Sequence, residues 1–203
     1  MSTILEKLKK LKYSYPWLWN IIESINGLLI KALYGQQLKR SITQSLKQVS
    51  GQYVYRCMYL ADADKLLQFI NDQPDGFDTY FKPHAFDLMT FRRVLSNGTY
   101  ILIGSFDDDN LIGYCFIRFF VNKSAFRGKI VDKRYQGRGI AKQMGQIMTN
   151  IAADAGFRVY ATISKYNVAS MQSAKSGAQI RVIKELPDDY LYIEIIKDRN
   201  HDS

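Results

Sequence analysis

Two glycines stand among basic side chains in residues 131–141, where a strand-like pattern gives way to a helix-like pattern. Gly137 and Gly139 are separated by Arg138, and Lys133, Arg134 and Lys142 lie close by in the sequence. The first amides of a helix have no partner within the helix, and the helix dipole adds partial positive charge there. Glycine lets the backbone approach a ligand without a Cβ atom in the way. The stretch therefore predicts a phosphate or pyrophosphate site, with an ordinary basic loop as the alternative.

Two common phosphate motifs do not fit this stretch. The dinucleotide fingerprint needs a third glycine where Lys142 stands, and the P-loop pattern is absent. What remains is Arg134-x-x-Gly137-x-Gly139. This pattern resembles motif A of the GNAT superfamily of acyl-CoA-dependent N-acetyltransferases, which reads Q/R-x-x-G-x-G/A.

A second local pattern supports the resemblance. Many GNAT members open the helix after the next strand with an asparagine, as N-x-x-A/S, and end it with an aromatic residue beside a glycine. Asn167 and Ser170 match the first part of this pattern, and Gly177 matches the glycine. Ala178 replaces the usual phenylalanine.

The expected elements also follow the GNAT order. Alternating and helical periodicities give β-α-α-β-β-β-α-β-α-β-β over residues 52–197. The resemblance implies an α/β (α+β) fold, with a mixed central sheet flanked by helices. We therefore expect a GNAT domain over residues 51–203, preceded by a separate segment, residues 1–50.

Residues 1–50 predict a basic amphipathic helix that starts near Pro16, followed by a polar linker at 41–51. The extension is similar to short basic helical extensions of bacterial GNAT-like chains. Two interpretations of residues 1–40 stand. The helix packs on the domain or on a second subunit, or it lies on the inner face of a membrane as a peripheral contact.

Composition limits the partners. Residues 1–50 hold eight lysines and arginines against two acids, whereas residues 51–203 hold twenty against seventeen. The nearly balanced main body argues against nucleic-acid binding. Cys57 and Cys115 lie in strand-like runs, which indicates buried thiols in a reducing, cytoplasmic compartment. His84 and His201 are far from each other in sequence, so we expect no metal.

The resemblance implies a binding site for acetyl-CoA as co-substrate. The pyrophosphate would take backbone N–H groups from five residues: Gln136, Gly137, Arg138, Gly139 and Ile140. Ile130 and Val131 would pair with the pantetheine arm as an added strand does, and Asn167 would hydrogen-bond that arm. Three lysines are candidates to neutralise the charge of the phosphates: Lys133, Lys142 and Lys175.

The acid and base are less defined. The family's tyrosine acid falls on Ala174, for which Tyr166 or Ser173 are candidate substitutes. His84 is the only histidine in the domain, which suits it to a base role, and a structural loop histidine is the alternative.

The segment around His84 is aromatic, and in this superfamily it covers the acceptor. The acceptor candidates are Phe81, Lys82 and Phe86. We expect transfer of an acetyl group to a primary amine of a small molecule, with an amino sugar as one example. Protein amine acetylation and a non-catalytic acyl-CoA-binding module are the alternatives.

Overall fold

The structure, a computed structural model, describes residues 16–81 and 83–198, with side chains described from residue 21 onward. A single seven-stranded sheet runs in the order β1-β2-β3-β4-β5-β7-β6. The strands are β1 (Val54–Cys57), β2 (Tyr100–Asp107), β3 (Asn110–Phe120), β4 (Ser124–Val131), β5 (Arg158–Ser164), β6 (Gln179–Leu186) and β7 (Tyr190–Ile196). The helices are α2 (Pro16–Lys47), α3 (Ala63–Asn71), α4 (Leu88–Ser96), α5 (Ile140–Asp154) and α6 (Val168–Lys175), with short 3-10 turns η1 (Leu60–Asp62) and η2 (Lys133–Tyr135). The order of elements in the domain is the one that the sequence predicts.

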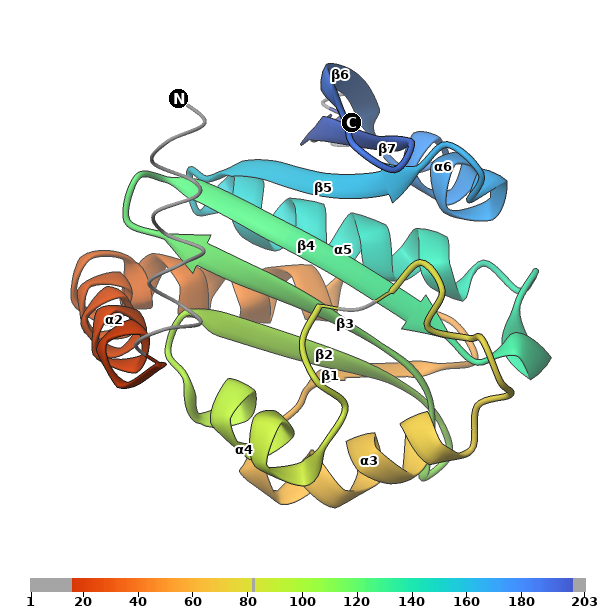
Figure 1. Cartoon of the computed structure of the whole chain (residues 1–203), viewed down its shortest axis with the longest axis horizontal. Coiled ribbons are helices and arrows are strands. Elements are labelled where there is room, and N and C mark those ends of the chain that lie inside the picture. The colour runs from red at the N-terminus through yellow and green to blue at the C-terminus, as the bar shows by residue number, and fades with distance from the viewer. Residues whose placement is uncertain (1–15, 82, 199–203) are drawn as a thin grey trace.

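Helices cover both faces of the sheet (Figure 1). Side chains alternate along β3, so that Cys115, Ile117 and Phe119 enter one core cluster and Tyr114 and Phe116 enter the other. The first cluster packs under α5 and α2, and the second packs under α3 and α4. We call these two sides of the sheet the α5 face and the α3–α4 face.

The sheet opens between β4 and β5. All other neighbouring strands pair antiparallel, but β4 and β5 run parallel and are joined through the α5 crossover. Their pairing covers only Ser124–Phe126 against Arg158–Tyr160. From residue 127 to residue 131 the β4 edge has no partner strand. We call the gap between this edge and the end of β5 the β4–β5 opening.

The α2 helix packs on the domain. The Ser41 hydroxyl donates to the Ile151 carbonyl in α5 at 2.9 Å, and Glu23 forms a 2.7 Å ion pair with Arg118 of β3. Ile30 is 1% exposed in the core under the α5 face. The first interpretation of this segment, packing on the domain, therefore describes residues 21–47, while contact with a membrane stays a prediction.

The helix is longer than the sequence predicts. The stretch 41–51 was expected as a linker because it is rich in serine and glutamine, yet α2 continues to Lys47. Ser41 and Ser45 are buried against the domain, 4% and 3% exposed. Small hydroxyl side chains allow α2 to lie close to α5, and this tertiary contact outweighs their low helix propensity. Among the described helices, none is long and apolar enough to cross a membrane.

Candidate active site

Six consecutive amides, from Gly137 to Lys142, donate no hydrogen bond within the described part of the chain. Gly137 and Gly139 have φ angles of 78° and 79°, a conformation that side chains with a Cβ atom rarely adopt. A Cβ atom placed at either glycine would meet nothing within 4 Å. The space above the turn is therefore free for a ligand, and the amides at the start of α5 point positive charge into it.

The side chains beside these amides hold the turn together. Arg134 forms an ion pair with Asp132 at 2.6 Å, and this contact holds the pKa of the Asp132 carboxyl below its usual range. The Arg138 guanidinium lies 4.9 Å from the centre of the Tyr135 ring. By contrast, the exposed Lys133 has no ion-pair partner among the described residues. The backbone amides are thus the main hydrogen-bond donors left for a ligand, and Lys133 can add positive charge.

The Q/R-x-x-G-x-G/A pattern fits this turn in two overlapping registers. The sequence analysis matched the pattern to Arg134, Gly137 and Gly139, but Gln136, Gly139 and Ala141 satisfy the same pattern. The second register places its fixed glycine at the N-cap of α5, where φ is positive. It also leaves Arg134 to its ion pair, so the second register describes the turn better.

The predicted pantetheine-binding residues lie on the open edge. Ile130 and Val131 pair with Tyr114 and Gly113 of β3 on one side only. On the other side, the Val131 carbonyl accepts from the Gln136 side-chain amide at 3.3 Å. The edge of β4 is therefore available for an added strand-like ligand that starts at the amide turn and runs toward Phe126.

Asn167 caps α6 on the far side of the opening. Its side-chain oxygen accepts from the Ser170 amide at 3.0 Å, as an N-cap residue does. Its side-chain NH2 has no acceptor among the residues that the structure describes. One asparagine can therefore fix the start of α6 and donate to a ligand.

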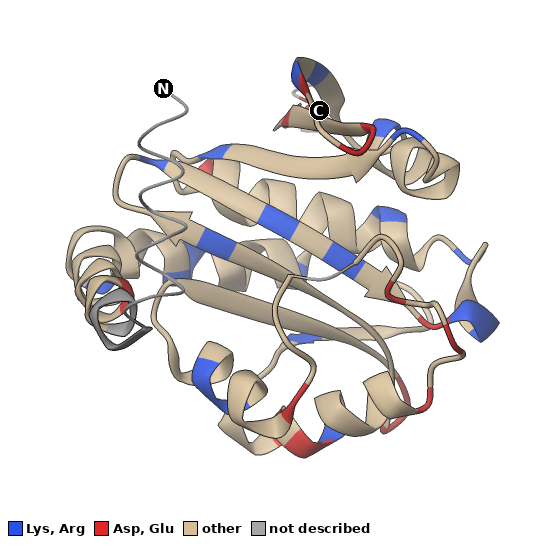
Figure 2. Ribbon diagram, in the orientation of Figure 1, with Lys and Arg blue, Asp and Glu red and all other residues tan. Residues whose placement is uncertain are grey.

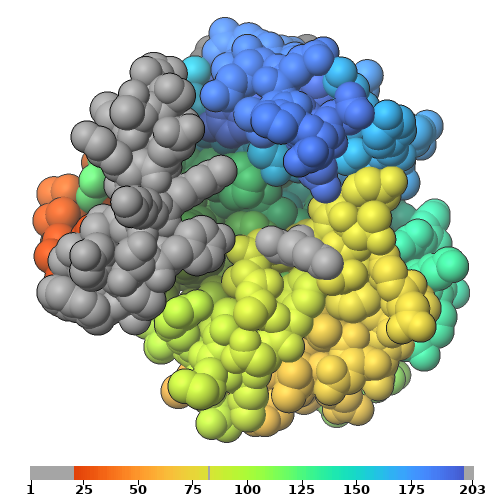
Figure 3. Space-filling view, viewed as in Figure 1, coloured from red at the N-terminus to blue at the C-terminus, as the bar shows by residue number. Residues whose placement is uncertain are grey.

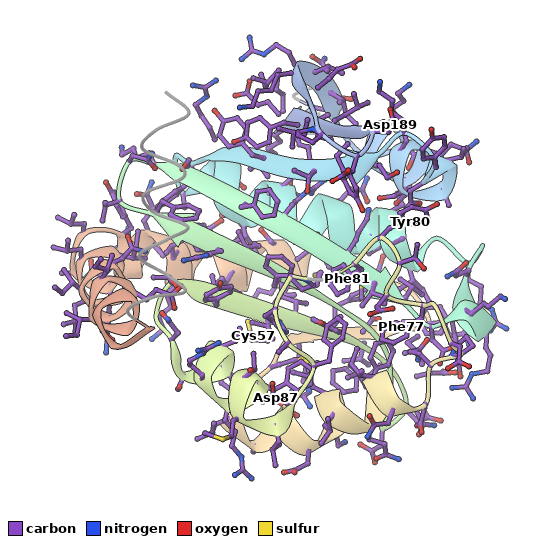
Figure 4. The ribbon with its side chains drawn as sticks, viewed as in Figure 1. Cys57, Phe77, Tyr80, Phe81, Asp87 and Asp189 are labelled. Carbon is purple, nitrogen blue, oxygen red and sulfur yellow. The ribbon has the colours of Figure 1, made fainter. Side chains whose placement is uncertain are left out.

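Of the predicted acceptor residues, Phe81 lies nearest to the opening. Its ring packs 5.6 Å from Tyr114 and 6.2 Å from Phe116 on the α3–α4 face, and its edge lies 3.2 Å from a Cβ atom built on Gly128 of β4. Figure 4 shows Phe81 in the segment that crosses the sheet in front of β3 and β4. Phe86 stacks on Phe81 at 6.3 Å, one layer farther away. Lys82 lies outside the described residues.

His84 lies deeper in this aromatic cluster. Its ring packs edge-on against Phe91 of α4 at 5.5 Å, and its Nδ1 lies 2.9 Å from the Ala85 carbonyl. Its Nε2 is buried and has no hydrogen-bond partner in the described part of the chain. Burial holds the pKa of His84 below its usual value, so the ring is neutral near pH 7. The base role stays a prediction and requires Nε2 to become accessible when substrate binds.

Two loops approach this segment from the other side of the opening. Tyr166, which follows β5, donates to Asp189 in the β6–β7 turn at 3.1 Å. The hydrogen bond to Asp189 is the largest cause that raises the pKa of Tyr166, and the nearby Tyr80 adds slightly to the rise. Figure 4 shows Tyr80 below the turn that carries Asp189.

A pocket of about 240 Å³ lies on the α3–α4 face at the closed end of the opening. Tyr160 and Tyr192 stack in parallel within it, with ring centres 5.3 Å apart. The other main lining residues are Arg118, Phe120, Ser124 and Phe126. Figure 3 shows the molecule hollowed between the C-terminal strands and the segment that carries Phe81. The sequence analysis missed this pocket, because its members come from four strands and meet only in the folded sheet.

The sequence analysis also missed two cations on β4, of which Arg127 is buried and Lys129 is half-buried. Arg127 and Lys129 alternate with Phe126 and Gly128, so they point to the α5 face, where Arg127 is 5% exposed. Figure 2 shows basic residues within β4, the strand that borders the opening. The signal available in the sequence was the presence of two basic residues on the same face of a strand that was expected to be buried.

Lys129 bridges three elements around the opening. Its ammonium donates to the Ala141 carbonyl of α5 at 2.6 Å and to the Ser173 hydroxyl of α6 at 2.7 Å. Burial is the largest cause that lowers the pKa of Lys129 to about 7, followed by repulsion from Arg127. Ala174, beside Ser173, is 4% exposed and faces the core.

Comparison with known proteins adds the family. The family model described as "Acetyltransferase (GNAT) family" matches residues 64–177, more than half of the chain. None of the curated proteins compared with the chain matches it significantly.

Solved structures show the same fold at low sequence identity. The PaiA N-acetyltransferase from Thermoplasma acidophilum, in complex with coenzyme A, has a TM-score of 0.60 at 13% identity, over 73% of this chain and 100% of that one. The spermidine N-acetyltransferase from Vibrio cholerae, in complex with CoA and spermine, has a TM-score of 0.60 at 15% identity, over 73% of this chain and 97% of that one. A ribosomal-protein alanine acetyltransferase from Vibrio fischeri has a TM-score of 0.60 at 15% identity, over 74% of this chain and 96% of that one. The motif, the open edge of β4 and the family model agree, and this chain belongs to the acetyltransferase (GNAT) family.

Proposed function

We propose that this protein transfers an acetyl group from acetyl-CoA to a primary amine of a small molecule. The observation that carries the proposal is the β4–β5 opening with six free amides at its mouth. A pyrophosphate on these amides directs the attached pantetheine arm along the free edge of β4, toward Phe126. The thioester then comes to the closed end of the opening, next to the pocket on the α3–α4 face.

The pocket supports a small acceptor. Its volume of about 240 Å³ lies just below the range of about 300 to 1,000 Å³ that is usual for small-molecule pockets, so it suits only a compact molecule. Tyr160 and Tyr192 line the pocket with aromatic surface on which a flat or sugar ring packs. The Ser124 hydroxyl donates to Asn122 and can still accept a hydrogen bond. An amino sugar combines such a ring with a primary amine.

The structural neighbours support the class of reaction and leave the acceptor open. One is a spermidine acetyltransferase crystallised with spermine, and another is a ribosomal-protein acetyltransferase. The small aromatic pocket favours a small amine over a protein terminus for this chain.

The test has two stages. Acetyl-CoA and CoA are first expected to raise the melting temperature of the full chain. Release of CoA is then followed with a thiol reagent against amino sugars, polyamines, aminoglycosides and a peptide with a free N-terminus. Release with a small amine supports the proposal. Release with the peptide alone assigns the chain to protein acetylation and rejects the small-molecule acceptor.

A second candidate is a module that binds acyl-CoA without catalysis. The observation in its favour is Ala174, which stands where the family's tyrosine acid is expected and is buried in the core. Stabilisation by acetyl-CoA without release on any amine of the panel would select this candidate.

A further inference from the structure

The side chain of Lys129 lies under the β4–β5 opening on the α5 face, in contact with α5 and α6. Lys129 belongs to β4, and its ammonium donates to Ala141 of α5 and Ser173 of α6. An ammonium has three N–H donors, so the third is available to another acceptor. Among the described residues, no carboxylate faces this group: the titratable groups around it are Arg127 on β4 and Cys115 on β3.

The fold makes room for this lysine. A Cβ atom on Gly145, in the middle of α5, would lie 3.1 Å from the Lys129 ammonium and 3.8 Å from the Arg127 guanidinium. A glycine inside a helix costs about 1 kcal/mol relative to alanine. The glycine is tolerated because the two cations occupy the space that a side chain would need.

We infer that Lys129 donates the proton that the sulfur of CoA takes up when the thioester bond breaks, and that Ser173 positions its ammonium. This inference rests on the proposed acetyl transfer. The family's acid is expected at position 174, where this chain has alanine. The inference assigns that role to Lys129, which reaches from β4 to Ser173, the neighbour of Ala174 in α6.

The step balances as follows. The neutral amine of the acceptor attacks the thioester carbonyl, the C–N bond forms, and the C–S bond breaks with its electron pair going to sulfur. The Lys129 ammonium gives a proton to sulfur, which leaves as the thiol. The proton that the attacking nitrogen loses returns through water to the neutral Lys129 amine.

The deciding experiment compares the wild-type chain with Lys129→Met, Lys129→Arg and Ser173→Ala. Lys65→Met, at an exposed position of α3, is the matched control for loss of a lysine. Acetyl-CoA affinity is measured by calorimetry, and turnover is measured from pH 6 to pH 10 with an amine that the wild type accepts. We expect Lys129→Met to retain acetyl-CoA affinity and to lose about 100-fold or more in turnover, a usual range for a general acid. Lys129→Arg keeps the charge but transfers its proton poorly, so it loses turnover as well.

The pH profile separates a proton donor from a structural lysine. Wild-type turnover is expected to fall on the alkaline side as Lys129 loses its proton, and Lys129→Met is expected to lack this fall. Ser173→Ala keeps the fall but moves its midpoint. An unchanged rate or an unchanged alkaline fall in Lys129→Met overturns the inference while acetyl transfer stands. A wild type that releases no CoA with any amine overturns both. An acetyl group found by mass spectrometry on Lys129 itself would show that it is a nucleophile, and it also overturns the inference.

A second feature, independent of the first, is the outer face of α2. Six large apolar side chains are exposed there, from 40% to 69%: Ile21, Ile22, Ile25, Leu28, Leu29 and Leu33. They lie on the side of the helix opposite Ile30 and Leu38, which face the core. A continuous apolar face of this kind marks an interaction surface.

The charges beside this face are all basic. The exposed cations on the described part of α2 are Lys31, Lys39, Arg40 and Lys47. The only acid there is Glu23, which turns inward to Arg118. We propose that α2 lies on an anionic lipid surface, with its apolar side chains at the level of the acyl boundary and its cations at the headgroups. A second copy of the chain would bring these cations together, which favours the lipid partner.

Vesicle flotation of the full chain tests this surface. We expect binding to vesicles of phosphatidylcholine with phosphatidylglycerol, weaker binding to phosphatidylcholine alone, and loss of binding in 0.5 M salt. Leu28→Asp with Leu33→Asp is expected to abolish binding, whereas Val182→Asp, on an exposed site of β6, is the control. Absence of flotation overturns the proposal. A dimer in light scattering that Leu28→Asp with Leu33→Asp dissolves, without vesicle binding, replaces the lipid with a second copy.

Discussion

Phe126 and Tyr160 form the last backbone pair between β4 and β5. Both side chains also line the pocket on the α3–α4 face. The pair therefore stands between the edge predicted for the pantetheine arm and the pocket proposed for the acceptor. In the proposed reaction the thioester and the amine meet beside this pair. The thioester arrives along the edge of β4, and the amine comes from the pocket.

The anion site predicts a strong effect of Gly137→Glu. A side chain would fill the space above the free amides and bring a negative charge against the pyrophosphate, so we expect acetyl-CoA affinity to fall about 100-fold or more. Calorimetry with CoA measures it. Gly156→Glu is a matched control, because Gly156 also has a φ of 78° and open space around its Cβ position. Equal affinity in both variants would remove the amide turn from the site.

His84→Ala tests the base role. If His84 accepts the proton of the amine, turnover falls while acetyl-CoA affinity stays within about twofold, since the imidazole contributes to the acceptor side alone. Phe91→Leu disturbs the same cluster and keeps the imidazole, so it controls for packing. Normal turnover in His84→Ala takes His84 out of the mechanism and leaves it a structural residue.

The ion pair between Glu23 and Arg118 links α2 to the pocket. The side chains are 15% and 22% exposed, and Arg118 Nε is already buried without a hydrogen-bond partner among the described residues. Glu23→Gln is expected to lower the free energy of unfolding by about 1–3 kcal/mol, because it leaves the partly buried charge of Arg118 without an opposite charge beside it. Urea unfolding measures this loss. Asp64→Asn breaks an exposed 4.0 Å pair with Arg92 and is expected to cost under about 0.5 kcal/mol.

Glu194 predicts an acid-dependent loss of stability. Its side chain is 7% exposed and pairs with Arg158 and Arg181, and the hydrogen bond from Arg158 is the first cause that lowers its pKa below the usual 4.5. The stability from this pairing is present above pH 4.5 and is lost as the pH falls through the lower, folded-state pKa. Glu194→Gln should unfold about 1–3 kcal/mol more easily at pH 7, and the difference should shrink in acid. Glu185→Gln, at a side chain 69% exposed, should show little of either effect.

For Lys129 we expect a gain in stability as the pH rises through the neutral and alkaline range. Its folded-state pKa is about 7 and its ordinary value is 10.5, so between these values the unfolded chain binds more protons. The wild type should therefore gain stability relative to Lys129→Met as the pH rises from 7 to 10, at about 1.4 kcal/mol for each unit of pKa difference. Melting curves of both proteins across this range provide the comparison, because their other groups titrate alike. A constant difference would contradict a buried, weakly basic Lys129.

The sequence by itself determined the elements and the anion turn. Strand alternation, helix periodicity and the two glycines are local signals, and the structure reproduces the predicted order and gives Gly137 and Gly139 positive φ angles. Asn167 was likewise predicted to open a helix, and it caps α6. Such features depend on a few neighbouring residues, so a single sequence contains them.

Only the tertiary structure decided where the chemistry lies. The pairing of β4 with β5 stops after Phe126 because of how two strands separated by α5 meet, which no local pattern encodes. The depth of His84 in its cluster and the burial of Lys129 depend on contacts between residues far apart in the chain, and α2 extends past Ser41 because α5 accepts its hydroxyl. Side-chain environment, and with it pKa, is a property of packing. The turn predicted to bind the anion was therefore readable from sequence, and the groups proposed to move protons were not.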